Sequence, residues 1–91
     1  MEFLVRFETR LPDTMSADDV ARLKTAERER ARQLREDGIL KKLWRVPGRR
    51  ATLGLWAAAD ATELHEALSS LPQFAWMDVE VEALATHPQE K

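Results

Sequence analysis

The sequence predicts an α+β fold in which one antiparallel sheet carries two helices on a single face. Residues 2–10 and 76–84 alternate apolar and polar residues with the period of two that is typical of half-buried strands, and residues 40–46 and 51–57 flank a Pro-Gly turn as two further strands. Two segments rich in good helix formers lie between them. The order is β-α-β-β-α-β, and right-handed crossovers in both βαβ halves place both helices on one side of the sheet. This arrangement is the ferredoxin-like sandwich.

The first strand is expected over residues 2–10, where Phe3, Val5 and Phe7 share one face. These three side chains are expected to face the helices. The long helix is expected over residues 17–36, a segment rich in Ala, Leu, Arg, Glu and Lys. The first half of the fold is therefore a strand followed by a helix of several turns.

Capping residues mark the ends of both helices. Ser16 is a suitable N-cap for the long helix, and Gly38 stands where a left-handed residue ends it. Asp60 caps a shorter helix that stops before Pro72, and Glu63 completes a capping box with Asp60. The buried stripe expected on this shorter helix consists of Ala61, Leu64, Leu68 and Leu71.

The remaining strands are expected over residues 40–46, 51–57 and 76–84, and Pro47-Gly48 joins the first two as a hairpin. The alternation leaves the face of Trp44 and Arg45 open. The face away from the helices is expected to carry Arg6, Glu8, Thr52, Trp56, Trp76, Asp78 and Glu80. A face that mixes charges and aromatic rings is typical of an interface between two packed sheets, and such sheets can enclose a pocket.

Length and composition narrow the possible functions. Ninety-one residues correspond to one domain, residues 1–91, whose small core favours association. A formal net charge of −2 argues against nucleic-acid or membrane partners. Without cysteine the chain has no disulfides, thiolate metal sites or paired thiols of a copper chaperone. No apolar run approaches the about 18 residues of a membrane span or resembles a signal peptide, so we expect a cytoplasmic protein.

Glu27 is the most informative single residue. At about 100° per residue, it lies only about 20° from Val20 and Leu34, inside the apolar stripe of the long helix. Lys24 and Arg30 flank it about 60° to either side. A carboxylate in this position must be paired, hydrogen-bonded, neutral or next to a cavity. Two interpretations stay open: a buried ion pair with Lys24 or a neighbouring subunit, and a general base tuned by partial burial.

A series of short motifs spans nearly the whole chain in a fixed order. They are Leu11-Pro12 with Met15, Leu23-Lys24-x-x-Glu27, Leu43-Trp44-Arg45-x-x-Gly48, Glu63-Leu64-His65 with Leu68, Leu71-Pro72-x-Phe74, Met77-Asp78-Val79-Glu80-Val81, and His87-Pro88. Each motif is weak alone. In their joint order and spacing the chain resembles the muconolactone isomerase family.

The resemblance implies a ferredoxin-like subunit that pairs through its sheet as a dimeric α/β barrel, with five dimers forming a decamer. It also implies a reaction without cofactor or metal, the isomerisation of muconolactone to the enol-lactone of 3-oxoadipate. This step belongs to the β-ketoadipate pathway of aromatic catabolism. Moving one proton along a conjugated lactone requires a base, cations or donors that stabilise a dienolate, and a basic anchor for the substrate carboxylate.

The resemblance also implies roles for individual residues. Glu27 matches the family's helix carboxylate and is the candidate base. Lys24 matches a lysine that stabilises enolate charge or holds the substrate, and Arg45 is the candidate anchor for the substrate carboxylate. The expected substrate-binding set is completed by Trp56, Trp76 and Asp78.

The sequence departs from the family at several positions, which leaves other functions open. Leu4 replaces a usual His, Arg50 replaces an aromatic, and Thr52-Leu53-Gly54-Leu55-Trp56-Ala57 replaces Asn-x-Ser-Val-Phe-Asp. One alternative is another cofactor-free enzyme on the same dimeric scaffold, a monooxygenase or a cyclase. A second is a small-molecule-binding or assembly protein without turnover. An RNA-binding domain is disfavoured, because the third strand offers only one stacking aromatic.

Overall fold

The computed structural model describes residues 1–90. Its main elements are β1 (Glu2–Thr9), α1 (Ala17–Glu36), β2 (Leu40–Arg45), β3 (Ala51–Ala57), α2 (Ala61–Ser69) and β4 (Met77–Leu84). Two short 3-10 helices follow α2 and β4, namely η1 (Phe74–Trp76) and η2 (Pro88–Glu90). Within the described residues, no helix has the length and apolar character needed to cross a membrane.

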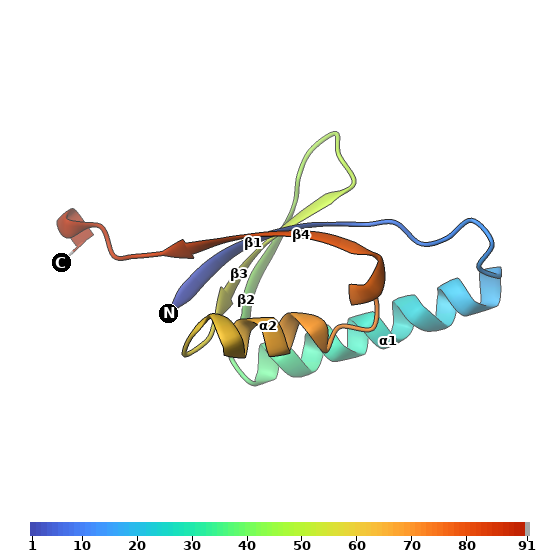
Figure 1. The fold of residues 1–91 in the computed structure, drawn as a ribbon, viewed down its shortest axis with the longest axis horizontal. Helices are drawn as coiled ribbons and strands as arrows, with labels where there is room; N and C mark the ends of the chain where they lie inside the picture. Colours follow the sequence, from blue (N-terminus) through green and yellow to red (C-terminus); the bar gives the residue numbers. More distant parts are fainter. Residues whose placement is uncertain (91) are drawn as a thin grey trace.

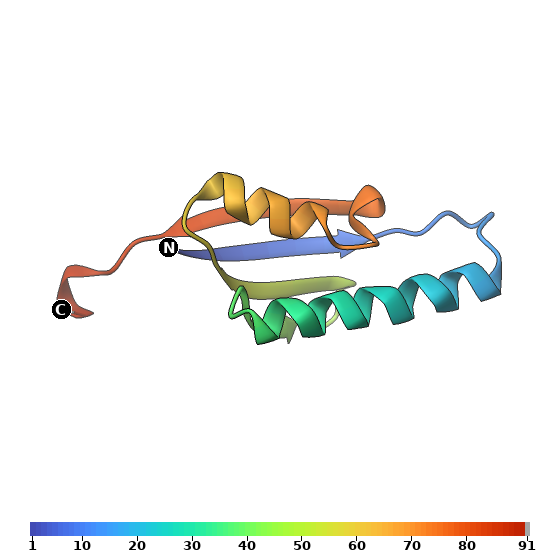
Figure 2. The same cartoon turned by 90° about the horizontal axis from the view of Figure 1, so that it is seen from below.

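The four strands form one antiparallel sheet in the order β2-β3-β1-β4. Both helices cover the same face of this sheet (Figure 1). Seen from that side, α2 lies over β4 and β1, while α1 lies beside β3 and β2 and projects past the strand ends (Figure 2). The predicted ferredoxin-like architecture is therefore confirmed.

The predicted helix boundaries are also confirmed by their capping contacts. The Ser16 hydroxyl accepts a hydrogen bond from the Asp19 N–H at 3.1 Å. Asp60 accepts one from the Glu63 N–H at 2.8 Å. After α1, Gly38 has a φ of +76°, a conformation that costs other residues more than glycine.

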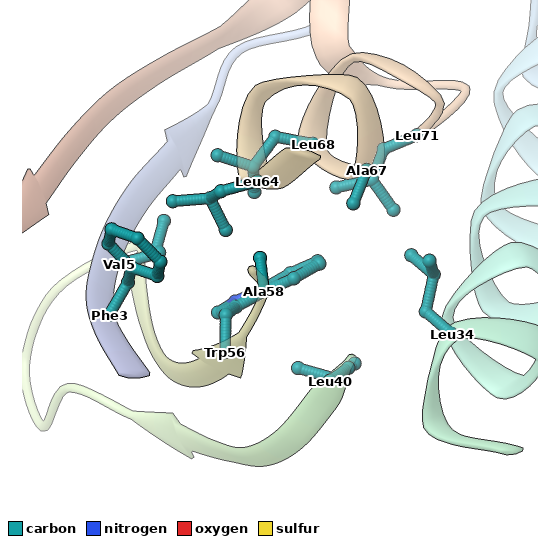
Figure 3. Packing of buried hydrophobic residues seen from close by; sticks show 10 residues of the cluster. All are labelled: Phe3, Val5, Leu34, Leu40, Trp56, Ala58, Leu64, Ala67, Leu68 and Leu71. Carbon is teal, nitrogen blue, oxygen red and sulfur yellow. The ribbon is translucent and has the colours of Figure 1, made fainter. Parts of the chain in front are cut away.

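The apolar core is built mainly by the sheet and α2 (Figure 3). Its buried residues are Phe3, Val5, Leu34, Leu40, Trp56, Ala58, Leu64, Ala67, Leu68 and Leu71. The prediction of Ala61 in the buried stripe of α2 is wrong, because this residue lies in the first turn, where the helix end is exposed. Ala67 is buried instead. Only Leu34 of α1 is fully buried.

The strand register corrects the predicted faces of two residues. Phe3 lies opposite Trp56, and Phe7 lies opposite Thr52. Residues directly opposite each other in a sheet share a face, so Trp56 and Thr52 point toward the helices and not to the open face. Trp56 is only 1% exposed. The β3 sequence is apolar in both phases of its alternation, so pairing with β1 decides which side chains turn inward.

A register shift in β2 settles the two residues whose face the sequence left open. The pairing with β3 slips between Leu40 and Lys42, which is a β-bulge or similar irregularity. Beyond the shift Arg45 lies opposite Thr52 and therefore faces the helices. Trp44 then faces the open side, where it is 45% exposed.

The start of β4 and the exposure of Val81 differ from the prediction, whereas the strand ends at Leu84 as predicted. Trp76 belongs to η1, so the strand begins one residue later, at Met77. Met77 and Val79 pack against the core as expected, whereas Val81 is 46% exposed. β4 is an edge strand, and its last residues run beyond α2 toward the C-terminus (Figure 1). The apolar alternation of β4 therefore continues past the part of the sheet that the helices cover.

Candidate active site

A cavity of about 690 Å³ opens between α1 and the helix-facing side of the sheet. It lies mainly where β1 and β2 end and where β3 and β4 begin. The residues around it are Phe7, Thr9, Lys24, Glu27, Arg28, Ala31, Leu40, Leu43, Arg45, Arg50, Thr52, Trp56, Leu71, Gln73 and Met77. The sequence indicated that two packed sheets can enclose a pocket on the open side; this cavity lies on the opposite side of the sheet, within one chain.

Glu27 projects from α1 into this cavity and is half-buried. Its Oε1 accepts a hydrogen bond of 2.9 Å from the backbone N–H of Gln73, in the connection between α2 and β4. Gln73 is itself 9% exposed. The ion pair with Lys24 that the sequence left open is absent from residues 1–90, where no cationic nitrogen lies within 4.0 Å of this carboxylate. A main-chain donor holds the acid in place.

Burial raises the pKa of the Glu27 carboxyl, and the Gln73 N–H lowers it by a smaller amount. Desolvation disfavours the charged form of a carboxylate, while a donor to that form favours it. The net effect is a pKa above the ordinary value of a glutamate. A carboxylate with a raised pKa is a stronger base, as the removal of a proton from carbon requires.

Four cationic side chains line the same cavity. Lys24 and Arg28 come from α1, Arg45 ends β2, and Arg50 lies in the turn before β3. Glu27 is the one acidic residue of the lining. The cavity therefore has a positive balance, and it suits an anionic ligand or a reaction in which negative charge develops.

Trp56 forms part of the cavity wall and depends on its small neighbour Gly54. The indole lies across Gly54, where an added Cβ would come 2.6 Å from the indole Nε1. Such a distance is shorter than real carbon atoms tolerate. The buried Nε1–H has no hydrogen-bond partner within residues 1–90. The absence of a side chain at Gly54 thus makes room for the Trp56 indole in the cavity wall.

The structure brings together four of the residues selected from the sequence. Glu27, Lys24, Arg45 and Trp56 all line the cavity. Two others lie elsewhere. The carbonyl of Trp76 accepts a hydrogen bond from the Arg10 N–H at 2.9 Å, and Asp78 lies on the open face, opposite Glu8. Three further residues of the cavity were not singled out from the sequence, namely Arg28, Arg50 and Gln73.

One of the missed residues carried a signal in the sequence. Arg28 follows Lys24 by four positions, so the two side chains share a face of α1. Gln73 offered no such signal, because its contribution is a backbone N–H that only the tertiary fold brings to Glu27.

Within the described chain, no group of three or more His, Asp or Glu side chains is arranged to hold a metal ion.

The fold and the cavity together define a class: a ferredoxin-like α+β protein with a half-buried carboxylate among cations, suited to proton transfer on an anionic substrate. The family model of muconolactone delta-isomerase matches residues 1–90, and the chain belongs to this family.

Individual relatives match over nearly their whole length. The Muconolactone Delta-isomerase 2 of Acinetobacter lwoffii is 40% identical over 96% of this chain and 91% of its own. The Muconolactone Delta-isomerase of Pseudomonas aeruginosa is 36% identical over 97% of this chain and 92% of its own. A crystal structure of muconolactone isomerase at 3.3 Å resolution superposes with a TM-score of 0.89 at 35% identity, covering 97% of this chain and 92% of that one.

Proposed function

We propose that the protein isomerises muconolactone, shifting a ring C=C bond by intramolecular proton transfer with Glu27 as the base. Relatives that carry the name of this activity match nearly the whole chain. The observation that carries the assignment of the base is the state of Glu27. It is half-buried in a cavity, free of ion pairs within residues 1–90, and held by one backbone donor.

The proposed reaction neither gains nor loses atoms. The Glu27 carboxylate removes the proton from the saturated ring carbon that carries the side chain. The electron pair of that C–H bond forms a new C=C bond, and the original C=C electrons move toward the lactone carbonyl, giving a dienolate. The carboxylic acid then returns the proton to the carbon beside the carbonyl, which regenerates the carboxylate and leaves the double bond moved by one position.

The hydrogen bond to Glu27 suits a group that takes up and returns a proton. Oε1 accepts the Gln73 N–H, whereas Oε2 accepts no hydrogen bond from residues 1–90. One oxygen thus fixes the orientation of the carboxyl while the other is available to the substrate. Orientation by a fixed donor lowers the entropy cost of reaching the reactive geometry.

The cations around the carboxylate take the two remaining roles. Lys24 lies one turn before Glu27 on α1 and stabilises the dienolate oxygen, where charge develops. Arg45 faces the cavity from β2 and binds the carboxylate of the substrate side chain, which matches the planar fork of a guanidinium. Trp56 forms the apolar wall beside the ring.

Replacement of the base is the direct test of this proposal. We expect Glu27→Gln to lower kcat/KM for muconolactone, followed by ultraviolet absorbance, by about 10²- to 10⁴-fold, the usual contribution of a general base. Glu36→Gln, at the exposed end of the same helix, is the matched control and keeps wild-type turnover. In the wild type, activity falls on the acidic side with a midpoint above the ordinary pKa of a glutamate. Full turnover by Glu27→Gln contradicts the assignment.

We further propose that the protein self-associates through the open face of its sheet, as a dimer and then a decamer, in the cytoplasm. The open face carries Trp44, which is 45% exposed, and residues 85–90 are exposed and lead away from the sheet (Figure 1). Trp44→Glu places a charge on this face and is expected to shift the sedimentation coefficient toward the monomer. If the wild type itself sediments as a monomer at micromolar concentration, this part of the proposal is contradicted.

A further inference from the structure

A buried polar group, the indole N–H of Trp56, lacks a protein partner within residues 1–90. The indole is 1% exposed and belongs to the apolar cluster that includes Leu34, Leu40 and Leu64 (Figure 3). Buried tryptophan N–H groups usually find an acceptor, because a donor withdrawn from water without one destabilises the fold. The unpaired N–H therefore indicates an acceptor that a ligand supplies.

The N–H edge of the indole is turned toward the cavity. A Cβ added at Gly54 would lie 2.6 Å from Nε1 and 3.1 Å from Cδ1, so this edge of the ring crosses the strand at Gly54. Gly54 precedes Trp56 by two residues on the same face of β3, toward the start of the strand. Leu43, opposite Gly54, and Thr52, near that start, line the cavity together with Trp56. The donor thus belongs to the cavity wall.

The cavity has an exposed, charged part and a buried part. The exposed part carries its four cations, Lys24, Arg28, Arg45 and Arg50. The buried residues of the lining are Leu40, Trp56, Leu71 and Gln73. In muconolactone the carbonyl and the side chain leave the ring on opposite sides of the ring oxygen. A substrate whose carboxylate binds Arg45 therefore turns its carbonyl toward the buried part.

We propose that the Trp56 Nε1–H donates a hydrogen bond to the lactone carbonyl oxygen of the substrate and so stabilises the dienolate. This inference rests on the proposed function, which supplies the lactone. A donor fixed in an apolar wall needs no reorganisation when charge develops on that oxygen, and water does not compete with it there. The carbonyl oxygen has two lone pairs, so it can accept this bond in addition to the contact with Lys24. Trp56 is then a catalytic residue as well as the wall beside the ring.

The direct test observes the indole N–H by NMR in the wild-type protein. The chain has three tryptophans. Trp44 and Trp76 lie outside the cavity lining and the core, so their resonances are internal controls, and Trp44→Phe and Trp76→Phe assign them. The probe is the saturated lactone with the same acetate side chain, which has no ring C=C bond to move. Its matched control is the cyclic ether in which two hydrogens replace the carbonyl oxygen.

We expect the saturated lactone to shift the Trp56 N–H proton downfield, as a new hydrogen bond does. The bound ether should leave this resonance near its free position, and Trp44 and Trp76 should respond to neither ligand. Equal shifts with lactone and ether would mean that Trp56 senses occupancy of the cavity and not the carbonyl oxygen, which overturns the proposal. A Trp56 resonance that stays unmoved at saturating lactone overturns it as well.

Trp56→Phe tests the same donor by kinetics. Loss of the N–H is expected to lower kcat/KM for muconolactone by about 10- to 100-fold, the usual effect of a hydrogen bond to a charged group. The loss should fall mainly on kcat, because charge develops on the oxygen only in the transition state. Circular dichroism establishes that the variant is folded. Wild-type turnover by folded Trp56→Phe contradicts the proposal.

Two double variants separate the lost donor from the lost volume. In the Trp56→Phe background, Gly54→Ser brings a hydroxyl close to the position that Nε1 leaves, whereas Gly54→Ala fills the same space without a donor. The serine should recover part of kcat, and the alanine should not. Equal rates in the two double variants would assign the loss to packing and not to the N–H.

The combined results distinguish failure of this inference from failure of the proposed function. If muconolactone is converted while the Trp56 N–H ignores the lactone, the donor role is refuted and the isomerase function stands. If the N–H responds to the carbonyl but no lactone is converted, the donor role is supported and the proposed isomerisation is contradicted. A lactone that neither binds nor reacts contradicts both.

Discussion

The two helices of this protein cover the same face of one sheet but have different roles. α2 is short, and it buries Leu64, Ala67 and Leu68 in the core. α1 is more than twice as long and buries only Leu34 completely. Lys24, Glu27, Arg28 and Ala31 of α1 line a cavity instead. α2 therefore stabilises the fold, whereas α1 positions charged groups around the cavity.

The largest effect that separates the two helices is expected from a pair of leucine truncations. Leu68→Ala on α2 removes a side chain that is 4% exposed and should lower the free energy of unfolding by about 2–5 kcal/mol. Leu23→Ala on α1 removes a partly exposed side chain and should cost about 1 kcal/mol. Urea denaturation measures both. Equal losses would show that α1 supports the core as strongly as α2 does.

An intermediate effect is expected where the sheet meets the cavity. Gly54→Ala places a Cβ 2.6 Å from the Trp56 Nε1 atom, and the buried ring has little room to move. Overpacking of this kind costs about 1–3 kcal/mol. In a Trp56→Phe background the crowding atom is missing, so the same glycine substitution should cost less. A double-mutant cycle with no coupling between the two positions would exclude this contact as the cause.

The smallest effect concerns the free energy of unfolding that is lost because α1 holds the Glu27 carboxylate partly buried. Because burial raises the pKa of Glu27, the folded protein binds more protons than the unfolded chain between the two pKa values. The free energy of unfolding therefore falls as the pH rises through this window. Glu27→Gln removes that loss and should be at least as stable as the wild type at neutral pH. The advantage should shrink at pH values below the ordinary glutamate range, as thermal unfolding at both pH values would reveal.

Glu36→Gln provides the comparison for this stability measurement. Glu36 lies exposed at the end of α1 and pairs with Arg32, so its replacement removes a surface contact and relieves no buried charge. We expect it to show no gain at neutral pH. A gain of the same size in both variants would mean that burial of Glu27 is not its source.

Much of this architecture could be predicted from the sequence because local patterns determine it. Phe3 and Val5 alternate with polar residues in one clear phase, and the caps at Ser16 and Asp60 mark where helices start. β3 was different. Its residues are apolar in both phases, so the inward position of Trp56 follows only from pairing with β1. The local sequence pattern does not predict the face of a side chain where cross-strand pairing determines it.

The candidate site divides in the same way. Helical periodicity alone singles out Glu27, because a carboxylate interrupts an apolar stripe. The donor that holds it comes from Gln73, 46 residues away, and no spacing rule connects the two. Arg50 lines the cavity only because the turn between β2 and β3 brings it there. Distant elements must meet before such residues become recognisable.

The bond between the Gln73 N–H and Glu27 has a consequence for how this site tolerates change. Its donor belongs to the main chain, so every amino acid except proline can supply it. Substitution of Gln73 by any residue except proline therefore keeps the hydrogen bond that orients the Glu27 carboxyl. Other residues around the cavity can therefore change while the main-chain contact that orients Glu27 stays in place.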